Sequence, residues 1–414
     1  MSNVLVSEKI GGYVFAWKDL GISITVSRLI VHKSDGRVTG EIVVQSVNDA
    51  GDMINIFPST QLNFSSDRTR VGLAKNLSVK YKQFPWGEIL DQLCDGVQER
   101  ARKGEPVQEL WTSAEGIKPP EPLLEPILYK GLPTVIYGDK GVHKSTLALA
   151  FYFCLVLPWH DNPLGLQAPD RSVKTLILDW ETEGTITQYY GKKIQDGHGL
   201  PGLIVQHRRC HLPLADDLEQ IWGHILDKKA EVIIIDSLAA AAGGELNKPE
   251  IALTFFSALR QLKTTSLLIA QNSKDPESQR KTIFGSVFFT YYARNILELC
   301  KSEATSEDVF DIALFHRWCN IGKLHKPMSF NLHYNETGLI IARQPFVAAE
   351  FITKLTNDQK ILEFLKRGAL KPKEVAKATG ISENYARVSL SRLKKKGLVI
   401  QIDDSWGLAV REDS

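Results

Sequence analysis

An apolar strand, a glycine-containing turn and an apolar helix follow one another between residues 133 and 157. The turn and the first helical residues are Gly138, Asp139, Lys140, Gly141, Val142, His143, Lys144, Ser145 and Thr146. In such a turn the backbone N–H groups point at phosphates, the lysine contacts the β- and γ-phosphate oxygens, and the hydroxyl after it holds Mg²⁺. The alternative, a chance turn before a buried helix, is disfavoured by the strand and helix on either side. The segment therefore predicts a nucleotide site in an α/β domain.

One residue departs from the phosphate-binding pattern, which has glycine directly before the lysine. This chain has His143 there. Histidine tolerates a positive φ better than most residues other than glycine, so the turn can still form. Its ring could still crowd the phosphates. We therefore expect nucleotide binding to persist and the rate of hydrolysis to be the property at risk.

Composition excludes some classes of protein. At 414 residues the chain is long enough for two or three domains. A net charge of only +2 gives no global field for nucleic acid, so any basic surface must be local. Five cysteines lie far apart, as expected for reduced thiols in a cytoplasmic protein. No signal-peptide profile opens the chain, and the longest apolar run, Leu147–Trp159, is too short to cross a bilayer, so we expect no membrane contact.

Three segments differ in pattern. Residues 1–115 alternate apolar and polar side chains, which predicts antiparallel strands followed by a helix, with no readable role. Residues 116–350 open with a proline-rich connector and then alternate strands with helices, which predicts a mostly parallel sheet covered on both faces. The strand candidates there are Pro133–Tyr137, Thr175–Trp180, Val232–Asp236, Ser266–Ala270, Asn295–Leu299 and Asp311–His316. Residues 351–414 predict three short helices and a hairpin, the plan of a winged helix.

Polar residues end or follow three of the predicted strands. Asp236 ends one of them, where a carboxylate beside the turn suits Mg²⁺ binding through a water molecule or through another ligand of the ion. Glu181 follows another and could orient the water that attacks the γ-phosphate, although Asp179 and Glu183 compete for that role. Gln271 and Asn272 follow a third and could sense the γ-phosphate or bound DNA through their amides, or simply belong to a turn.

The segments Gly138–Thr146, Leu176–Thr182 and Ile233–Ala240 together resemble the RecA-like P-loop ATPases, and among them the replicative-helicase-like branch common on plasmids and phages. The likeness covers about residues 122–345. It implies ATP and Mg²⁺ as cofactors, a homo-oligomeric ring or filament with ATP between subunits, and action on nucleic acid. It also implies Glu181 as the catalytic glutamate, Asp236 as the acidic strand-end residue and Gln271 as the sensor. It further implies a basic residue supplied in trans by a neighbouring subunit, for which Arg317 and Lys323 are the candidates. The alternative is that both are ordinary surface charges.

The C-terminal segment is locally basic. Residues 357–414 contain 12 lysines and arginines against 8 aspartates and glutamates. In the predicted helix Ser382–Lys396, Ala386, Leu390 and Leu393 would form the buried stripe. The residues turned outward, with side chains suited to bases and phosphates, would be Asn384, Arg387, Ser391 and Lys395. The alternative is a winged helix that binds protein.

Three functions fit these observations. The first is an ATP-dependent motor or loader of the replication or recombination kind that acts on single- or double-stranded DNA. The second is a nucleotide-gated DNA-binding regulator in which His143 leaves little hydrolysis. The third is an ATPase adaptor of a mobile-element or anti-phage system that acts through protein contacts.

Overall fold

The computed structural model describes residues 4–9, 11–32, 34–48, 50–103, 109, 110, 116, 118–273, 282–302, 307–346, 349–366 and 368–409. Two compact units are distinguished. The first comprises Met1–Lys118, Leu214–Leu226 and Ser257–Lys263, and the second comprises Pro119–Pro213, Asp227–Phe256 and Thr264–Ser414. The predicted domain boundary after residue 115 lies outside the described residues.

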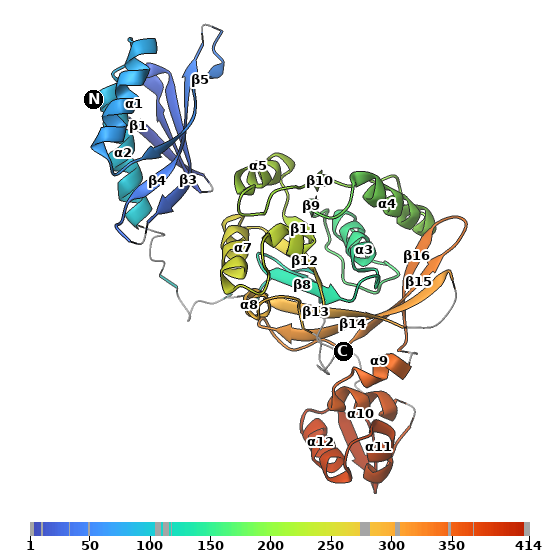
Figure 1. The fold of residues 1–414 in the computed structure, drawn as a ribbon. Coiled ribbons are helices and arrows are strands. Elements are labelled where there is room, and N and C mark those ends of the chain that lie inside the picture. The colour runs from blue at the N-terminus through green and yellow to red at the C-terminus, as the bar shows by residue number, and fades with distance from the viewer. Residues whose placement is uncertain are drawn as a thin grey trace. The chain divides into compact units, whose positions relative to one another are not determined.

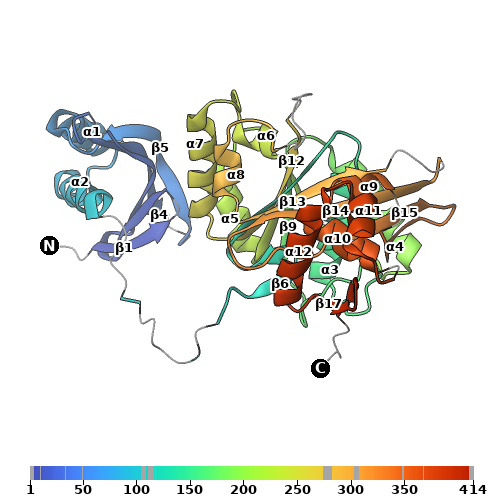
Figure 2. The ribbon, with the colours of Figure 1, turned by 90° about the horizontal axis from the view of Figure 1, so that it is seen from below.

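The N-terminal segment is an antiparallel sheet with two helices on one face (Figures 1 and 2). Its elements are β1 (Val4–Lys9), β2 (Gly12–Trp17), the short 3₁₀ helix Lys18–Leu20, β3 (Ile22–Val31), β4 (Val38–Val47), β5 (Met53–Asn63), α1 (Asp67–Lys80) and α2 (Trp86–Lys103). The strands pair in chain order, and their inward side chains share a core with the helices. A hydrogen bond of 2.7 Å from Trp17 Nε1 to Gln92 Oε1 joins the sheet to α2. The predicted strand-rich module is confirmed.

A nine-stranded sheet forms the centre of the second unit. Its strands are β8 (Pro133–Gly138), β9 (Thr175–Asp179), β10 (His207–Arg209), β11 (Val232–Asp236), β12 (Thr265–Gln271), β13 (Asn295–Lys301), β14 (Val309–Cys319), β15 (Met328–Tyr334) and β16 (Leu339–Gln344). Their order is β10-β9-β11-β12-β8-β13-β14-β15-β16. The first six are mutually parallel, and the last three continue antiparallel. A separate small sheet pairs β6 (Pro122–Leu124) with β7 (Leu128–Tyr129).

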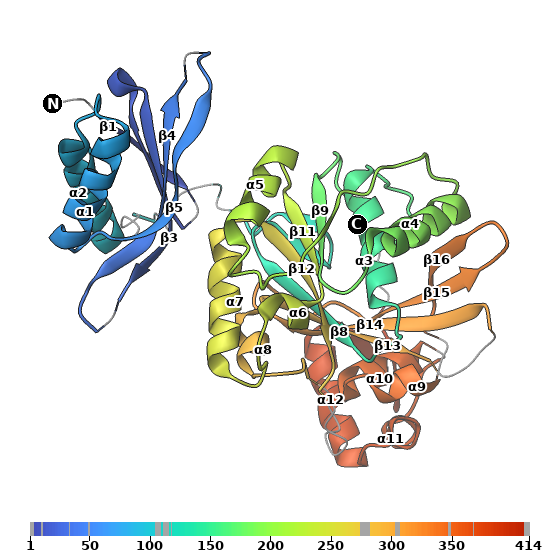
Figure 3. The same cartoon turned by 45° about the horizontal axis from the view of Figure 1, so that its top comes forward.

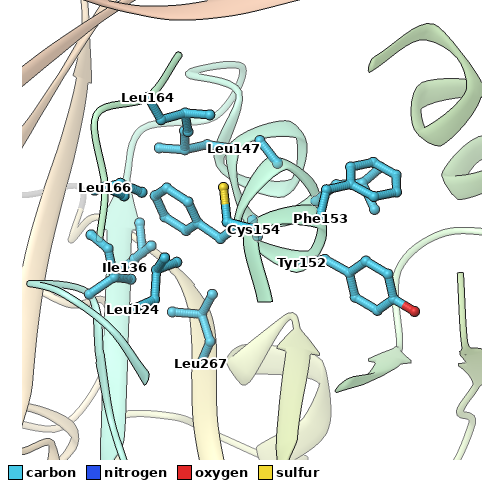
Figure 4. Close-up of a cluster of buried hydrophobic side chains, with 14 of the residues drawn as sticks. Leu124, Ile136, Leu147, Tyr152, Phe153, Cys154, Leu164, Leu166 and Leu267 are labelled. Carbon is cyan, nitrogen blue, oxygen red and sulfur yellow. The ribbon is translucent and has the colours of Figure 1, made fainter. Parts of the chain in front are cut away.

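The helix after the glycine turn is buried against this sheet. Nearly every residue of α3 (Lys144–Val156) is apolar, and a helix that is apolar on all sides belongs inside a core. Leu147 and Phe153 of α3 share the core with Ile136 of β8 and Leu267 of β12 (Figure 4). Helix α4 (Gly184–His198) lies beside α3 and contributes Ile194 (Figure 3). The end of the glycine turn, where α3 begins, is thus fixed by the packing of α3 in the core.

The remaining helices of the central segment are α5 (Leu218–Lys228), α6 (Leu238–Ala242), α7 (Pro249–Gln261) and α8 (Phe288–Tyr292). Phe255 and Phe256 of α7 lie 6.4 and 6.1 Å, between ring centroids, from Phe289 of α8. Within the described residues no helix combines the length and apolarity needed to span a membrane.

The C-terminal segment has a small core of its own. Its elements are α9 (Ala349–Thr353), α10 (Asn357–Leu365), α11 (Pro372–Thr379), α12 (Glu383–Lys395), β17 (Val399–Ile402) and β18 (Ser405–Leu408). Ile361, Val375, Leu390 and Trp406 are buried together. Three helices and an antiparallel hairpin confirm the predicted winged helix. The sequence predicts the first of these helices over Asp358–Arg367 and the last strand over Trp406–Val410, and the end residues Arg367 and Val410 lie outside the described residues.

Candidate functional site

Four parallel strands bring the predicted polar residues to one edge of the sheet. Asp236 at the end of β11 is in register with Asp179 of β9, and Gln271 at the end of β12 is in register with Gly138 of β8. Glu181 is the second residue after β9. Because the carboxyl ends of parallel strands share an edge, these residues flank the glycine turn, as ligand-binding residues do in open α/β sheets.

Lys144 occupies the centre of this edge. Its Nζ donates hydrogen bonds to the carbonyl oxygens of Gly138, at 3.0 Å, and Asp139, at 2.7 Å. Burial lowers the pKa of Lys144, and the nearby carboxylates of Asp236 and Glu181 oppose that shift. The ammonium group therefore already lies in the loop, close to both acids.

His143 takes the backbone conformation that glycine would take. Its φ of 64° and ψ of 32° are left-handed, as the sequence led us to expect if the turn needed a positive φ. The ring packs 4.9 Å from Phe310 of β14 and 6.2 Å from Tyr334 of β15, between centroids. Burial and then Lys301, whose Nζ lies 4.0 Å from the Phe310 ring centroid, lower the pKa of His143. The imidazole is therefore neutral at neutral pH and is held by the rings of the antiparallel strands.

Ser145 and Asp236 form the pair best suited to a divalent cation. The Ser145 hydroxyl donates a hydrogen bond to the Asp236 carboxylate, which is 9% exposed. Burial raises the pKa of Asp236 to about 6, and the negative charges of Asp179 and Glu181 add to the rise. A desolvated carboxylate among other carboxylates, beside a hydroxyl, is a set of hard oxygen ligands that fits Mg²⁺.

Asp179 organises the loop that carries Glu181. Its Oδ1 accepts hydrogen bonds of 2.8 Å from the backbone N–H groups of Glu181 and Thr182. Its Oδ2 accepts one of 2.5 Å from the Thr182 hydroxyl and lies 3.3 Å from His207 Nε2. These hydrogen bonds lower the pKa of Asp179 in spite of burial, which alone would raise it. Asp179 is thus occupied in holding the loop.

The three acids after β9 occupy different surroundings. Glu181 accepts a hydrogen bond from the Ser237 hydroxyl and lies near enough to Lys144 to oppose the lowering of its pKa. Glu183 has a side chain 72% exposed and pairs with Arg209 at 3.4 Å. Since the Asp179 carboxylate is engaged by these hydrogen bonds and the Glu183 side chain is exposed, Glu181 is the acid available at this edge of the sheet.

The polar pair after β12 lies beside the loop. Gln271 is exposed, and its carbonyl accepts a hydrogen bond of 2.8 Å from the Phe284 N–H. The Asn272 N–H donates to the Gly138 carbonyl at 3.2 Å. Asn272 is buried, and its Oδ1 has no hydrogen-bond partner among the described residues. The sequence pattern could not distinguish these two neighbours.

Arg317 and Lys323, the two proposed trans-acting cations, differ in their surroundings. The Arg317 guanidinium donates two hydrogen bonds to Glu298 Oε2 at 2.7 Å and one to the Lys354 carbonyl at 3.1 Å. Glu298 is buried and lies 3.6 Å from Lys354 Nζ. Lys323 is exposed in the loop between β14 and β15. Arg317 is therefore engaged within its own chain, and Lys323 faces solvent.

The outward face of α12 is as predicted. Asn384, Arg387, Ser391 and Lys395 are exposed, while Ala386, Leu390 and Leu393 are buried. The Ser382 side chain caps the helix by accepting from the Tyr385 N–H at 3.3 Å. Arg387 pairs with Glu383 one turn earlier at 2.7 Å, an exposed ion pair that contributes little to stability.

Two family models match parts of the chain. Residues 98–277 match the family model described as an AAA domain, and residues 355–400 match that of a winged helix-turn-helix DNA-binding domain. No curated protein shows a significant match. A solved KaiC-like protein from the hyperthermophilic archaeon Pyrococcus horikoshii OT3 is 15% identical, with 54% of this chain and 94% of that chain covered and a TM-score of 0.37. The chain combines an α/β core of RecA-like fold with a winged helix.

Proposed function

We propose that this protein binds ATP with Mg²⁺, hydrolyses it, and acts on DNA through its winged helix. The observation that carries the proposal is the meeting of Lys144, Ser145, Asp236 and Glu181 at one edge of the parallel sheet. The match of residues 355–400 to DNA-binding winged helices supports the second half.

Each residue has a role that follows from its chemistry. The N–H groups of the glycine turn and the start of α3 receive the phosphates. Lys144 exchanges its two carbonyl partners for β- and γ-phosphate oxygens. Ser145 and Asp236 would hold Mg²⁺, which would supply positive charge where negative charge develops on the phosphate oxygens. Glu181 orients a water molecule toward the γ-phosphorus and takes its proton, while the bond from that phosphorus to the β–γ bridging oxygen breaks and ADP leaves. Gln271 would sense the γ-phosphate from the end of β12.

The finer proposal is a helicase-like motor or loader of the replication or recombination type. It would work as a homo-oligomer in which a neighbouring subunit supplies a positive charge. Lys323 suits that role better than Arg317, because Arg317 already neutralises the buried Glu298.

His143 favours a second candidate, a nucleotide-gated DNA-binding regulator. A ring held against Phe310 replaces a glycine hydrogen beside the lysine, so it links the loop to β14. In that case ATP would bind tightly and turn over little.

Turnover of ATP with and without single- and double-stranded DNA tests these proposals. We expect DNA-stimulated hydrolysis that is lost in Lys144→Ala and in Glu181→Gln, with ATP binding lost only in the former. Glu183→Gln is the matched control for Glu181→Gln and Lys192→Ala for Lys144→Ala, and both should keep wild-type rates. Tight ATP binding with negligible turnover would favour the regulator, and absence of any DNA affinity would contradict both and leave an adaptor.

A further inference from the structure

The outermost stripe of α12 contains one apolar residue that its polar neighbours do not explain. Asn384, Val388, Ser391 and Lys395 are spaced by four, three and four residues, so they align along one face of the helix. This face is opposite Ala386, Leu390 and Leu393 in the small core. Val388 is 65% exposed at the middle of the stripe. The sequence pattern singled out only the polar members.

A valine gives this position nothing within the protein. A β-branched residue slightly weakens a helix, and an exposed one gains no burial. Val388 lies between Asn384 and Ser391 on the same face, so it forms a small apolar surface at the centre of a polar face. In the major groove of duplex DNA the only apolar group that a base presents is the methyl group of thymine.

Asn384 complements this contact one turn earlier. It lies in the first turn of α12, and the first residues of a recognition helix are the ones that reach base edges. An asparagine amide matches adenine, because it donates to N7 and accepts from the N6 amino group. A stripe with asparagine and valine one turn apart therefore fits neighbouring A·T base pairs.

The hairpin of β17 and β18, called the wing below, adds little attraction for DNA phosphates. Asp403 and Asp404 form the exposed turn between β17 and β18, and two carboxylates there repel the DNA backbone. Positive charges lie instead at the C-terminal end of α12, at Lys394, Lys395 and Lys396. The helix rather than the wing thus provides both the phosphate contacts and the base contacts.

We propose that α12 reads double-stranded DNA from the major groove at A·T base pairs, with Asn384 on adenine and Val388 against a thymine methyl group. This inference rests on the proposed DNA-binding function and specifies its ligand as a duplex that contains A·T pairs.

The experiment uses the full-length protein. A random-sequence pool of DNA duplexes is first selected for binding to the protein, and one enriched duplex is kept. Each thymine of the enriched site is then replaced by deoxyuridine, which lacks only the methyl group. We expect one or two replacements to weaken wild-type binding about four-fold. Val388→Ala should bind the thymine duplex with the same loss and should be indifferent to deoxyuridine. Ile400→Ala, which removes an exposed apolar side chain from the wing, is the control and should keep the sensitivity.

Asn384→Ala gives a second, independent measurement. It should weaken binding about ten-fold and remove the preference for A·T at one position of the enriched site. Enrichment of no common sequence, or a common sequence insensitive to deoxyuridine, would overturn the inference and leave DNA binding intact. Absence of binding to any duplex would instead contradict the DNA-binding function itself.

Discussion

Asp236 is a carboxylate whose burial destabilises the nucleotide-free protein. Its pKa is about 6 in the folded chain against 3.8 when exposed, so the folded state binds the extra proton. A raised carboxyl pKa costs stability once pH rises above the unfolded value, and the full cost is present above the folded one. Asp236→Asn should therefore stabilise the nucleotide-free protein by up to about 3 kcal/mol at pH 7.5 and by almost nothing below about pH 4.

Calorimetry measures this change in stability. The relevant unfolding transition is the one whose midpoint temperature shifts when ATP and Mg²⁺ are added. In Asp236→Asn the transition of the nucleotide-free protein should move up at pH 7.5, and the further shift with ATP and Mg²⁺ should be lost. Asp170→Asn, an exposed aspartate, is the control and should change neither. A lower transition temperature at pH 7.5 would mean that the charge of Asp236 is compensated in the folded chain.

In the proposed mechanism Asp179 positions Glu181, the proposed catalytic residue, and does not itself contact the nucleotide. Without its carboxylate two backbone N–H groups lose their acceptor, and the loop is free to move the catalytic side chain. Displacement of a catalytic group by about 1 Å costs about 100-fold in rate. Asp179→Ala should lower kcat by that order and leave the KM for ATP nearly unchanged.

The split between kcat and KM separates positioning from general damage. Asp170→Ala should leave both parameters unchanged. If Asp179→Ala raises KM as much as it lowers kcat, then the residue supports the whole nucleotide site and not Glu181 in particular.

Single residues could be predicted from sequence where a motif fixes them, and not where two distant segments meet. Lys144 and Asp236 follow from a turn pattern and a strand end. The hydrogen bond between Ser237 and Glu181 joins residues 56 positions apart, so only the register of β9 with β11 reveals it. The ion pair of Arg317 with Glu298 likewise depends on the pairing of β13 with β14, and the sequence left Arg317 a free cation.

At the scale of elements, strands with a continuous apolar run were predictable, and strands that are short or interrupted by polar residues were not. Five-residue runs such as Val232–Asp236 are buried at every position, which makes them stand out. The three-residue β10 and the antiparallel pair β15 and β16 lack such a run and were missed. Strand order, with β12 and β13 on either side of β8, depends on contacts across the whole segment and cannot be obtained from local pattern.

The acidic wing gives a prediction about an element as a whole. Replacing both Asp403 and Asp404 with lysine should convert the hairpin into a phosphate contact. DNA affinity should rise, and the slope of log affinity against log salt should steepen by about 0.9 for each phosphate gained. The gain should be the same for all duplex sequences, because phosphate contacts carry no base information.

A matched control adds the same charge elsewhere. The double variant Asp308→Lys and Glu336→Lys changes two exposed acids of residues 116–350. If this variant steepens the salt dependence as much as the wing variant does, the effect comes from net charge and the wing has no place near DNA.

At the scale of the whole molecule, Lys144 is the cation proposed in cis, and a second one supplied between subunits has to be a residue without a partner in its own chain. Lys144 belongs to the glycine turn, whereas Arg317 is bound to Glu298, a buried acid that it helps to neutralise. Removing one partner of a buried ion pair leaves an uncompensated charge and costs about 3 kcal/mol or more. Loss of activity in an Arg317 variant would therefore report on folding, which makes Lys323 the informative position for a charge supplied between subunits.

Mixing two inactive variants tests whether a neighbour completes the site. Glu181→Gln keeps Lys323 but cannot hydrolyse, and Lys323→Ala keeps Glu181 but lacks the donated charge. If subunits assemble head to tail, random mixing in equal amounts makes about a quarter of the interfaces productive and restores that share of turnover. Lys326→Ala, an exposed lysine three residues further on, should be active by itself. Full activity of Lys323→Ala alone, or no recovery in a mixture that light scattering shows to be oligomeric, would mean that Lys323 supplies no charge across the interface.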